Sequence, residues 1–240
     1  MSYKERSYRN WVQTSDLVSF EVREKETDLF ISAKRLLESQ AREAIVAYRS
    51  DLERYIRRDE EFFTSLAPVD VKEDAPSIVK VMADAAAAAG VGPMAAVAGA
   101  IAEFVGRDLL AFTDEVIVEN GGDIFLRTLK VRKLGVYAGE DSPFTGNLAL
   151  EITPKEEGLG VCTSSGTVSH SLSFGKADAA LIISKEAALA DAVATAACNV
   201  VKNEFDINAG IEFAKSVEGV LGVLIIVRDK MGSWGEIKLA

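Results

Sequence analysis

The sequence predicts an α+β protein with an antiparallel sheet, and three observations support this prediction. Short strand-like segments follow one another in pairs that turn residues separate, which is typical of hairpins. Long helical segments lie between these groups of strands, so the chain lacks the regular alternation of strand and helix that a parallel sheet requires. The patterns G-x-G-x-x-G and G-x-x-x-x-G-K-[ST] are both absent, so nothing indicates a Rossmann or P-loop fold.

The composition limits the classes of protein to consider. Hydrophobic residues make up 48% of the 240 residues, which is enough for a sizeable core, and we expect a single domain over residues 1–240. The net charge of −10 disfavours nucleic acid as a partner, because binding to its phosphates relies on clustered Lys and Arg. No export signal, lipoprotein leader or membrane-spanning run is visible, so we expect a cytoplasmic protein without a membrane partner. Assembly into a homo-oligomer stays open.

The first half of the chain begins with an expected hairpin and two helices. The segments Val18–Arg23 and Asp28–Ser32 alternate as strands do and are joined by a short polar turn. A charged amphipathic helix is expected from Ala33 to about Phe63, because apolar residues recur at helical spacing. A second helix is expected over Ser77–Ala89, with Ser77 as its N-cap.

The second half is expected to contain most of the strands. Gly90 and Gly92 interrupt the helical pattern, which resumes over Met94–Gly106. The strands expected after it are Val116–Val118, Ile124–Lys130, Lys133–Tyr137, Leu148–Thr153, Leu159–Thr163 and Ala179–Ser184. The segments Val217–Arg228 and Gly235–Leu239 are expected to close the chain as a hairpin around Lys230–Gly232.

The segment Ala187–Val201 is the most informative part of the chain. Its alanines, valines and leucine predict a buried helix, while Asp191, Thr195 and Asn199 recur at intervals of four and therefore share one face. A buried carboxylate must be hydrogen-bonded or bound to a metal. Oxygen ligands of this kind suit Mg²⁺. The alternative is that Asp191 reaches solvent at the helix edge and Thr195 bonds back to the preceding turn.

Two further segments carry small and polar residues where the local pattern calls for core. The first consists of Asn120, Gly121, Gly122 and Asp123 at a strand end, where paired glycines allow either a close approach to a ligand or an ordinary hairpin turn. The second runs from Ser164 to His170, where backbone N–H groups and hydroxyls suit phosphate or ribose oxygens, unless it is only a surface loop.

Single residues with reactive side chains leave further alternatives open. His170 is a candidate general base for an acceptor hydroxyl, or else a structural histidine in a polar loop. With one histidine in the chain, zinc and iron sites made of several histidines are excluded. Cys198 is expected in the core, whereas Cys162 at a strand end is the candidate for an exposed thiol.

Three motifs in this order, ENGGDI, TSSGTVSHSLSFG and LADAVATA, resemble the ApbE family of FAD:protein FMN transferases. The resemblance spans roughly residues 91–201 and is most specific in the last motif. The chain is similar to a shorter branch of that family. The resemblance implies a T-fold-like architecture, α+β with antiparallel sheets and long helices, in which two halves surround a central cleft for a flavin dinucleotide.

The resemblance also implies a chemistry and a set of site residues. In that family, Mg²⁺ polarises the pyrophosphate of FAD, and FMN passes to a Thr or Ser of an acceptor protein. Carried over by motif, Asp191 and Thr195 are the metal ligands, and His170, as the candidate general base, is the expected catalytic residue. The residues expected to bind the flavin nucleotide are Asn120, Gly121, Gly122, Asp123, Ser164, Ser165, Gly166, Thr167 and Gly175.

Two departures from the family pattern separate the possible functions. The family has a Lys-Gly-Tyr-like segment before the GG turn, where this chain has AAVAGAIAE at Ala95–Glu103. After the histidine, the family usually shows Asp-Pro-x-Thr-Gly, where this chain has Ser171–Gly175 without a carboxylate. Three functions follow: a Mg²⁺-dependent flavin transferase, a protein on the same fold that binds a nucleotide or metabolite without catalysis, and an accessory protein of sulfur metabolism that uses Cys162 or acts through protein contacts.

Overall fold

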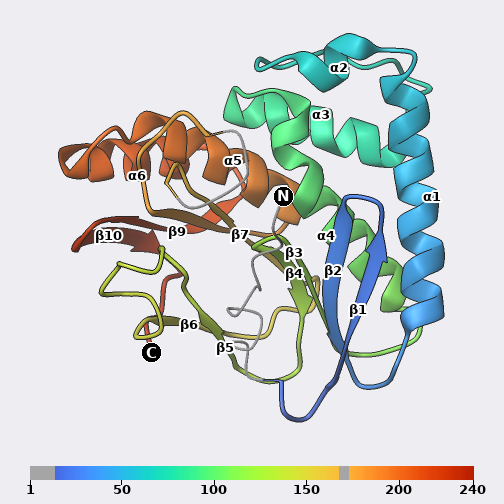
Figure 1. The fold of residues 1–240 in the computed structure, drawn as a ribbon, viewed down its shortest axis with the longest axis horizontal. Helices are drawn as coiled ribbons and strands as arrows, with labels where there is room; N and C mark the ends of the chain where they lie inside the picture. The colour runs from blue at the N-terminus through green and yellow to red at the C-terminus, as the bar shows by residue number, and fades with distance from the viewer. Residues whose placement is uncertain (1–13, 168–172) are drawn as a thin grey trace.

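The computed structural model describes residues 14–167 and 173–240. Its main feature is an eight-stranded antiparallel sheet in the order β1-β2-β3-β4-β7-β8-β9-β10, accompanied by the two-stranded sheet β5-β6. The helices gather on one face of the large sheet, and β5 and β6 lie on the other (Figure 1). The prediction of an α+β fold with antiparallel strands is confirmed.

The elements have the following bounds. The strands are β1 (Val18–Glu24), β2 (Thr27–Ala33), β3 (Val116–Asn120), β4 (Asp123–Arg127), β5 (Arg132–Gly135), β6 (Ala149–Ile152), β7 (Leu159–Ser164), β8 (Ala179–Ser184), β9 (Val220–Val227) and β10 (Lys230–Gly235). The helices are α1 (Glu38–Ile56), α2 (Glu60–Thr64), α3 (Ser77–Ala89), η2 (Pro93–Ala96), α4 (Val97–Leu109), α5 (Ala187–Val200), η3 (Glu204–Asp206) and α6 (Ile207–Ser216).

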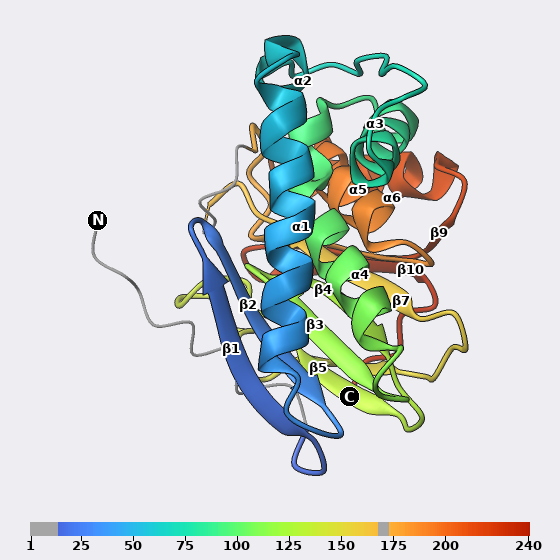
Figure 2. The same ribbon diagram turned by 90° about the vertical axis from the view of Figure 1, so that its right-hand side faces the viewer.

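The large sheet consists of two halves that are built alike. In each half a hairpin is followed by helices and then by a second hairpin, which gives β1 to β4 in one half and β7 to β10 in the other. The halves join where β4 pairs with β7, with Ile124 opposite Val161. Above this seam, on the helical side, α4 and α5 pack against each other. Figure 2 shows α1 lying beside α4 at the outer edge of the helical layer.

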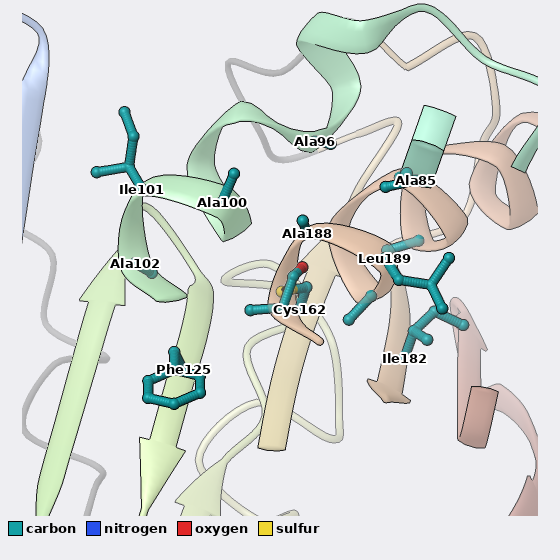
Figure 3. Packing of buried hydrophobic residues seen from close by; sticks show 14 of the residues in the cluster. Ala85, Ala96, Ala100, Ile101, Ala102, Phe125, Cys162, Ile182, Ala188 and Leu189 are labelled. Carbon is teal, nitrogen blue, oxygen red and sulfur yellow. The ribbon is translucent and has the colours of Figure 1, made fainter. Parts of the chain in front are cut away.

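The central strands of the sheet are buried on both faces, and their side chains alternate between two hydrophobic cores. In β8, Ala180 and Ile182 face the helices, while Leu181 and Ile183 face the second core with β5 and β6. This follows from the period of two along a strand. Every residue of α5 from Ala187 to Cys198 is buried, which confirms the prediction that this Ala-rich helix lies inside (Figure 3).

The long N-terminal helix differs from the prediction at both ends. Ala33 belongs to β2, where it pairs with Val116 of β3, because sheet pairing prevails over a helical pattern that sequence alone extends too far. The helix then ends at Ile56, and Asp59 starts the separate helix α2 by accepting a hydrogen bond from the Phe62 N–H at 3.2 Å. In α3 the N-cap is Pro76 rather than Ser77, and no side chain caps that end.

The C-terminal hairpin also differs from the prediction. Its turn lies at Arg228 and Asp229, before the predicted turn at Lys230–Gly232, and β10 already begins at Lys230. Arg228 adopts a left-handed conformation with φ of 55°, which the sequence does not signal because glycine usually marks such a position. The helix α6 between α5 and β9 was not predicted.

The remaining predicted elements agree within a few residues. The helix expected over Met94–Gly106 is divided into η2 and α4, and β4 ends at Arg127 rather than continuing to Lys130. Within the part of the chain that the structure describes, no single helix is long and apolar enough to cross a membrane. The helices Ser77–Ala89 and Pro93–Leu109, which meet at a bend of 104°, reach such a length and apolar composition only when taken together.

Candidate functional site

The candidate site lies where α4, α5 and the seam between the sheet halves meet. Gly99 on α4 makes this close approach possible, since a Cβ there would lie 2.2 Å from the Ala187 carbonyl oxygen and 2.8 Å from Cβ of Asp191. Real Cβ atoms do not tolerate such distances, so glycine is required. The small residues of both helices therefore bring the backbone of α4 within reach of the Asp191 carboxylate.

Each of the two helices receives its N-terminal cap from the other. Asp191 Oδ2 on α5 accepts a hydrogen bond from the Gly99 N–H in the first turn of α4, at 2.9 Å. Glu103 Oε2 on α4 accepts hydrogen bonds from Ala187 N–H at 2.6 Å and Ala188 N–H at 3.4 Å, in the first turn of α5. The N–H groups of a first turn lack partners within their own helix, so each carboxylate stabilises the start of the neighbouring helix.

Only one of these two carboxylates has a cationic partner. Glu103 forms an ion pair with Arg107 one turn further along α4, at 2.7 Å. Asp191 has no ion pair among residues 14–167 and 173–240 and lies instead beside a second buried carboxylate, Asp123 of β4. In the described chain, the N–H groups of Gly99 and Ala98 are the contacts that favour the ionised form of Asp191.

The ionisation of the two aspartates reflects this environment. Burial raises the pKa of Asp191 to about 7, although the N–H groups of Gly99 and Ala98 act in the opposite direction. Burial also raises the pKa of Asp123 well above its ordinary value, and the charge of Asp191 raises it further. Two carboxylates held together in a low-dielectric site cannot both ionise easily without a cation. The site therefore favours a proton or a metal ion.

The Asn120–Asp123 segment forms the turn of the β3–β4 hairpin. Gly121 and Gly122 both have positive φ, 71° and 110°, so the alternative of a hairpin turn is the one the backbone adopts. The turn nevertheless lies at the site. Asn120 donates from Nδ2 to the Ala98 carbonyl oxygen at 3.1 Å, and Asp123 Oδ1 accepts from the Thr163 N–H at 3.3 Å.

The predicted Ser-Gly loop, described up to Thr167, is hydrogen-bonded to residues 177–178. The Ser165 hydroxyl and the Gly166 N–H donate to the Ala177 carbonyl oxygen at 3.4 and 3.0 Å, and the Thr167 hydroxyl donates to Asp178 at 2.7 Å. Ser164 is buried at the end of β7. These residues continue directly from Thr163, beside Asp123, and Ser164 and Gly166 also form hydrogen bonds with Cys198 near the C-terminal end of α5.

The polar face of α5 connects Asp191 to the far end of the same loop. Thr195 is buried one turn after Asp191. One turn further, Asn199 Oδ1 accepts hydrogen bonds from the Phe174 N–H at 2.7 Å and the Ser173 hydroxyl at 3.2 Å. Gly175 lies against the C-terminal turn, since a Cβ there would be 1.7 Å from the Cys198 carbonyl oxygen. His170 and residues 171–172 lie outside the described residues.

Both thiols are buried. Cys198 lies in the core as predicted, but the expectation of an exposed Cys162 is wrong. Burial raises the pKa of the Cys162 thiol, and the charges of Asp123 and Asp191 raise it further. A thiol in such surroundings is a poor nucleophile. Figure 3 shows Cys162 on β7 beneath the first turn of α5, where Sγ donates to the Ala187 carbonyl oxygen at 3.3 Å.

Sequence reasoning missed Glu103, which caps α5. A signal was present, because Glu103 is the only charged residue in the apolar segment 94–106. A charged side chain on a buried helix requires a partner. Its partner is far away in sequence, and no local pattern identifies it.

Asp123 and Asp191 are the buried carboxylates available to a metal ion at this site. Within the described residues no group of three or more His, Cys, Asp or Glu side chains is arranged to hold a metal. Asp123 and Asp191 nevertheless supply two anionic oxygen donors, and Thr195 supplies a hydroxyl one turn away. A set with few protein oxygens fits Mg²⁺, which keeps several waters and shares its coordination with substrate phosphates.

Comparison with known proteins decides the family. A family model described as "AbpE bacteria" matches residues 9–220. The chain belongs to this family. It is 46% identical over 205 residues to a UPF0280 protein of Methanocaldococcus jannaschii, covering 82% of each chain. It is 43% identical over 217 residues to a UPF0280 protein of Methanopyrus kandleri, covering 88% of each chain.

The fold matches solved structures of ApbE proteins. The apo flavinyl transferase ApbE of Pseudomonas stutzeri superimposes with a TM-score of 0.60 at 14% identity, covering 91% of this chain and 94% of that one. The ApbE protein of Thermotoga maritima gives a TM-score of 0.55 at 12% identity, covering 90% and 96%. The predicted ApbE-like fold is therefore confirmed.

Proposed function

We propose that this chain binds a flavin dinucleotide, or a related nucleotide, together with Mg²⁺ at the site formed by Asp123, Asp191 and Thr195. The observation that carries the proposal is the pair of buried aspartates without a cationic partner in the described chain. A divalent cation held by these residues would offset their negative charge and allow both carboxylates to ionise inside the protein. The Pseudomonas stutzeri and Vibrio cholerae proteins of the same fold are named flavin transferases, which supports a flavin as the ligand.

The chain's own residues have separate roles in this proposal. Asp191 is oriented by the N–H groups of Ala98 and Gly99, so its carboxylate is fixed before a ligand arrives. Asp123 is fixed from the sheet side by the Thr163 N–H. Mg²⁺ bound by these oxygens would offset the negative charge of the nucleotide pyrophosphate.

Transfer of FMN to an acceptor protein is the finer form of the proposal. A Thr or Ser hydroxyl of the acceptor attacks the phosphorus on the FMN side of the pyrophosphate, the bond to the AMP oxygen breaks, and AMP leaves. The hydroxyl proton passes to a base, for which His170 is the candidate.

Binding without transfer is the second candidate, and one observation favours it. In place of the family's Lys-Gly-Tyr-like segment, Gly99 and Glu103 serve the packing and capping of α5. The two candidates differ in their products. Transfer releases AMP from FAD and leaves a fluorescent protein band after denaturing electrophoresis of an extract incubated with FAD and Mg²⁺, whereas binding alone does neither.

Calorimetric titration with FAD tests the binding proposal. We expect Mg²⁺ to strengthen FAD binding to the wild type about tenfold or more, and Asp191→Asn to lose this dependence because a neutral amide is a poor Mg²⁺ ligand. Asp84→Asn is the matched control, since Asp84 is exposed on α3 and its replacement changes the net charge equally. Equal FAD affinity for all three proteins with and without Mg²⁺ would contradict the proposal.

A further inference from the structure

The first turn of α5 is held from three sides at a single residue, Ala187. Its N–H donates to Glu103 of α4 at 2.6 Å. Its carbonyl oxygen accepts from the Cys162 thiol of β7 at 3.3 Å. Gly160 of β7 lies directly beneath, since a Cβ there would be 2.3 Å from the Ala187 Cα. The position of α5 over the sheet is thus set at its N-terminus.

Glu103 is itself fixed, and its two oxygens have different partners. Oε1 accepts from Nε of Arg107 at 2.9 Å and pairs with Nη2 at 2.7 Å. Oε2 is thereby left to accept from α5. The Glu103 side chain is 6% exposed, so water does not compete for these hydrogen bonds. An anchored, buried carboxylate of this kind holds its partner helix with little freedom.

This anchored turn lies one helical turn from the candidate metal ligand Asp191. Four residues of an α-helix rise about 6 Å, so a small shift or tilt at Ala187 moves the Asp191 carboxylate relative to Asp123. Asp123 is fixed to the sheet, beside Cys162 across the β4–β7 pairing. The separation of the two aspartates therefore depends on how α5 is held above β4 and β7.

We infer that Glu103 is a positioning residue for the cation site: through the N-terminus of α5 it sets Asp191 against Asp123. This inference rests on the proposed function. Glu103 touches neither the cation nor the nucleotide in this assignment. Without the Glu103 carboxylate, the first turn of α5 loses its hydrogen-bond acceptor and can shift. The position of Asp191 relative to Asp123 then changes, and Mg²⁺ binds more weakly. Loss of an outer residue that orients a metal ligand commonly weakens metal affinity by about 10- to 100-fold.

Titration with Mg²⁺ alone, followed by calorimetry, tests the inference without any measurement of activity. We expect Glu103→Ala to bind Mg²⁺ about tenfold more weakly than the wild type. Glu103→Gln is expected to stay within about threefold, because its amide oxygen still accepts from Ala187 and Ala188. Glu38→Gln is the matched control, since Glu38 forms the same i,i+4 pair with Arg42 on the exposed side of α1.

A second control separates positioning from general loss of stability. Leu52 is buried in α1, and Leu52→Ala should lower the melting temperature while leaving Mg²⁺ affinity unchanged. Should Glu103→Ala fail to fold, Glu103→Asp decides the matter, because it keeps the charge but withdraws the carboxylate by one methylene. Weakened Mg²⁺ binding by Glu103→Asp then supports the inference, and wild-type affinity overturns it.

The possible failures are distinguishable. A wild type that takes up no Mg²⁺ in the absence of nucleotide overturns this inference, whereas the proposed function is overturned only when Mg²⁺ also leaves the FAD affinity unchanged. A wild type that binds Mg²⁺ while Glu103→Ala binds equally well overturns the positioning role alone. An equal loss of affinity in Leu52→Ala also overturns it, because the effect would then follow from stability.

Discussion

The two ends of the contact between α4 and α5 use the same device for different purposes. At one end Glu103 caps α5 and is paired with Arg107; at the other Asp191 caps α4 but faces Asp123. Arg107 neutralises the charge of Glu103, so this cap needs no further ion and has a structural role. Asp191 lies beside a second carboxylate without a cationic partner in the described chain, so a cation would be stabilised there. The difference shows that the surroundings, not the residue type, distinguish a structural carboxylate from a candidate site.

The largest expected loss of stability comes from a substitution that forces α4 and α5 apart. Gly99→Ala places a methyl group against the Ala187 carbonyl oxygen and Asp191, and we expect it to lower the free energy of unfolding by about 3 kcal/mol. Gly90→Ala provides the comparison, because a Cβ at Gly90 meets nothing within 4 Å and only the left-handed backbone costs about 1 kcal/mol. Urea unfolding measures both. Equal losses would show that the helix crossing is not tight.

The next prediction concerns the two caps themselves. Glu103→Ala leaves two buried N–H groups of α5 without an acceptor, and we expect a loss of about 2 kcal/mol in the free energy of unfolding. Asp191→Asn keeps an oxygen for the Gly99 N–H and removes a buried charge, so its free energy of unfolding should stay within about 0.5 kcal/mol of the wild type or rise. A loss in Asp191→Asn as large as that in Glu103→Ala would remove the distinction between the two ends.

The third prediction is a pH dependence that belongs to Asp191. Its pKa of about 7 in the folded protein lies above the ordinary value of 3.8, so the folded state binds the proton more tightly than the unfolded state. The stability that this proton contributes is fully present below about pH 4 and is lost as the pH rises through 7. In a chelating buffer, the wild type should therefore lose about 1 kcal/mol more than Asp191→Asn between pH 6 and pH 8. Parallel stability curves would contradict the assignment.

The smallest expected loss of stability comes from removing the cationic partner of Glu103, so that Glu103, like Asp191, has no ion pair. Arg107→Met removes the cation beside Glu103 but keeps an apolar stem against the Phe125 ring, over which Arg107 lies at 5.2 Å. Because Arg107 is half exposed, we expect a loss of only about 0.5–1 kcal/mol in the free energy of unfolding at pH 7. Thermal unfolding with and without added Mg²⁺ measures it. A loss above that of Glu103→Ala would mean that Arg107, and not the cap, holds α5.

Much of the fold could be predicted from the sequence because its signals are local. Alternation predicted the N-terminal hairpin, and the all-round apolar pattern predicted that α5 is buried. The predicted boundaries were wrong where contacts with residues distant in sequence outweighed the local pattern. Ala33 belongs to a strand because Val116 pairs with it, and Arg228 makes the last turn although no glycine marks the position.

For the candidate site, the sequence by itself determined which side chains share a face. The four-residue spacing places Asp191 and Thr195 together on any α-helix, and paired glycines at 121 and 122 favour a tight turn. The family resemblance assigned Asp123 and Asp191 to one site, but only the tertiary structure decided that Cys162 is buried beside them and that Glu103 holds α5. Those facts depend on the pairing of β4 with β7 and on how closely α4 crosses α5. Both are contacts between residues far apart in the chain, and local spacing carries no information about them.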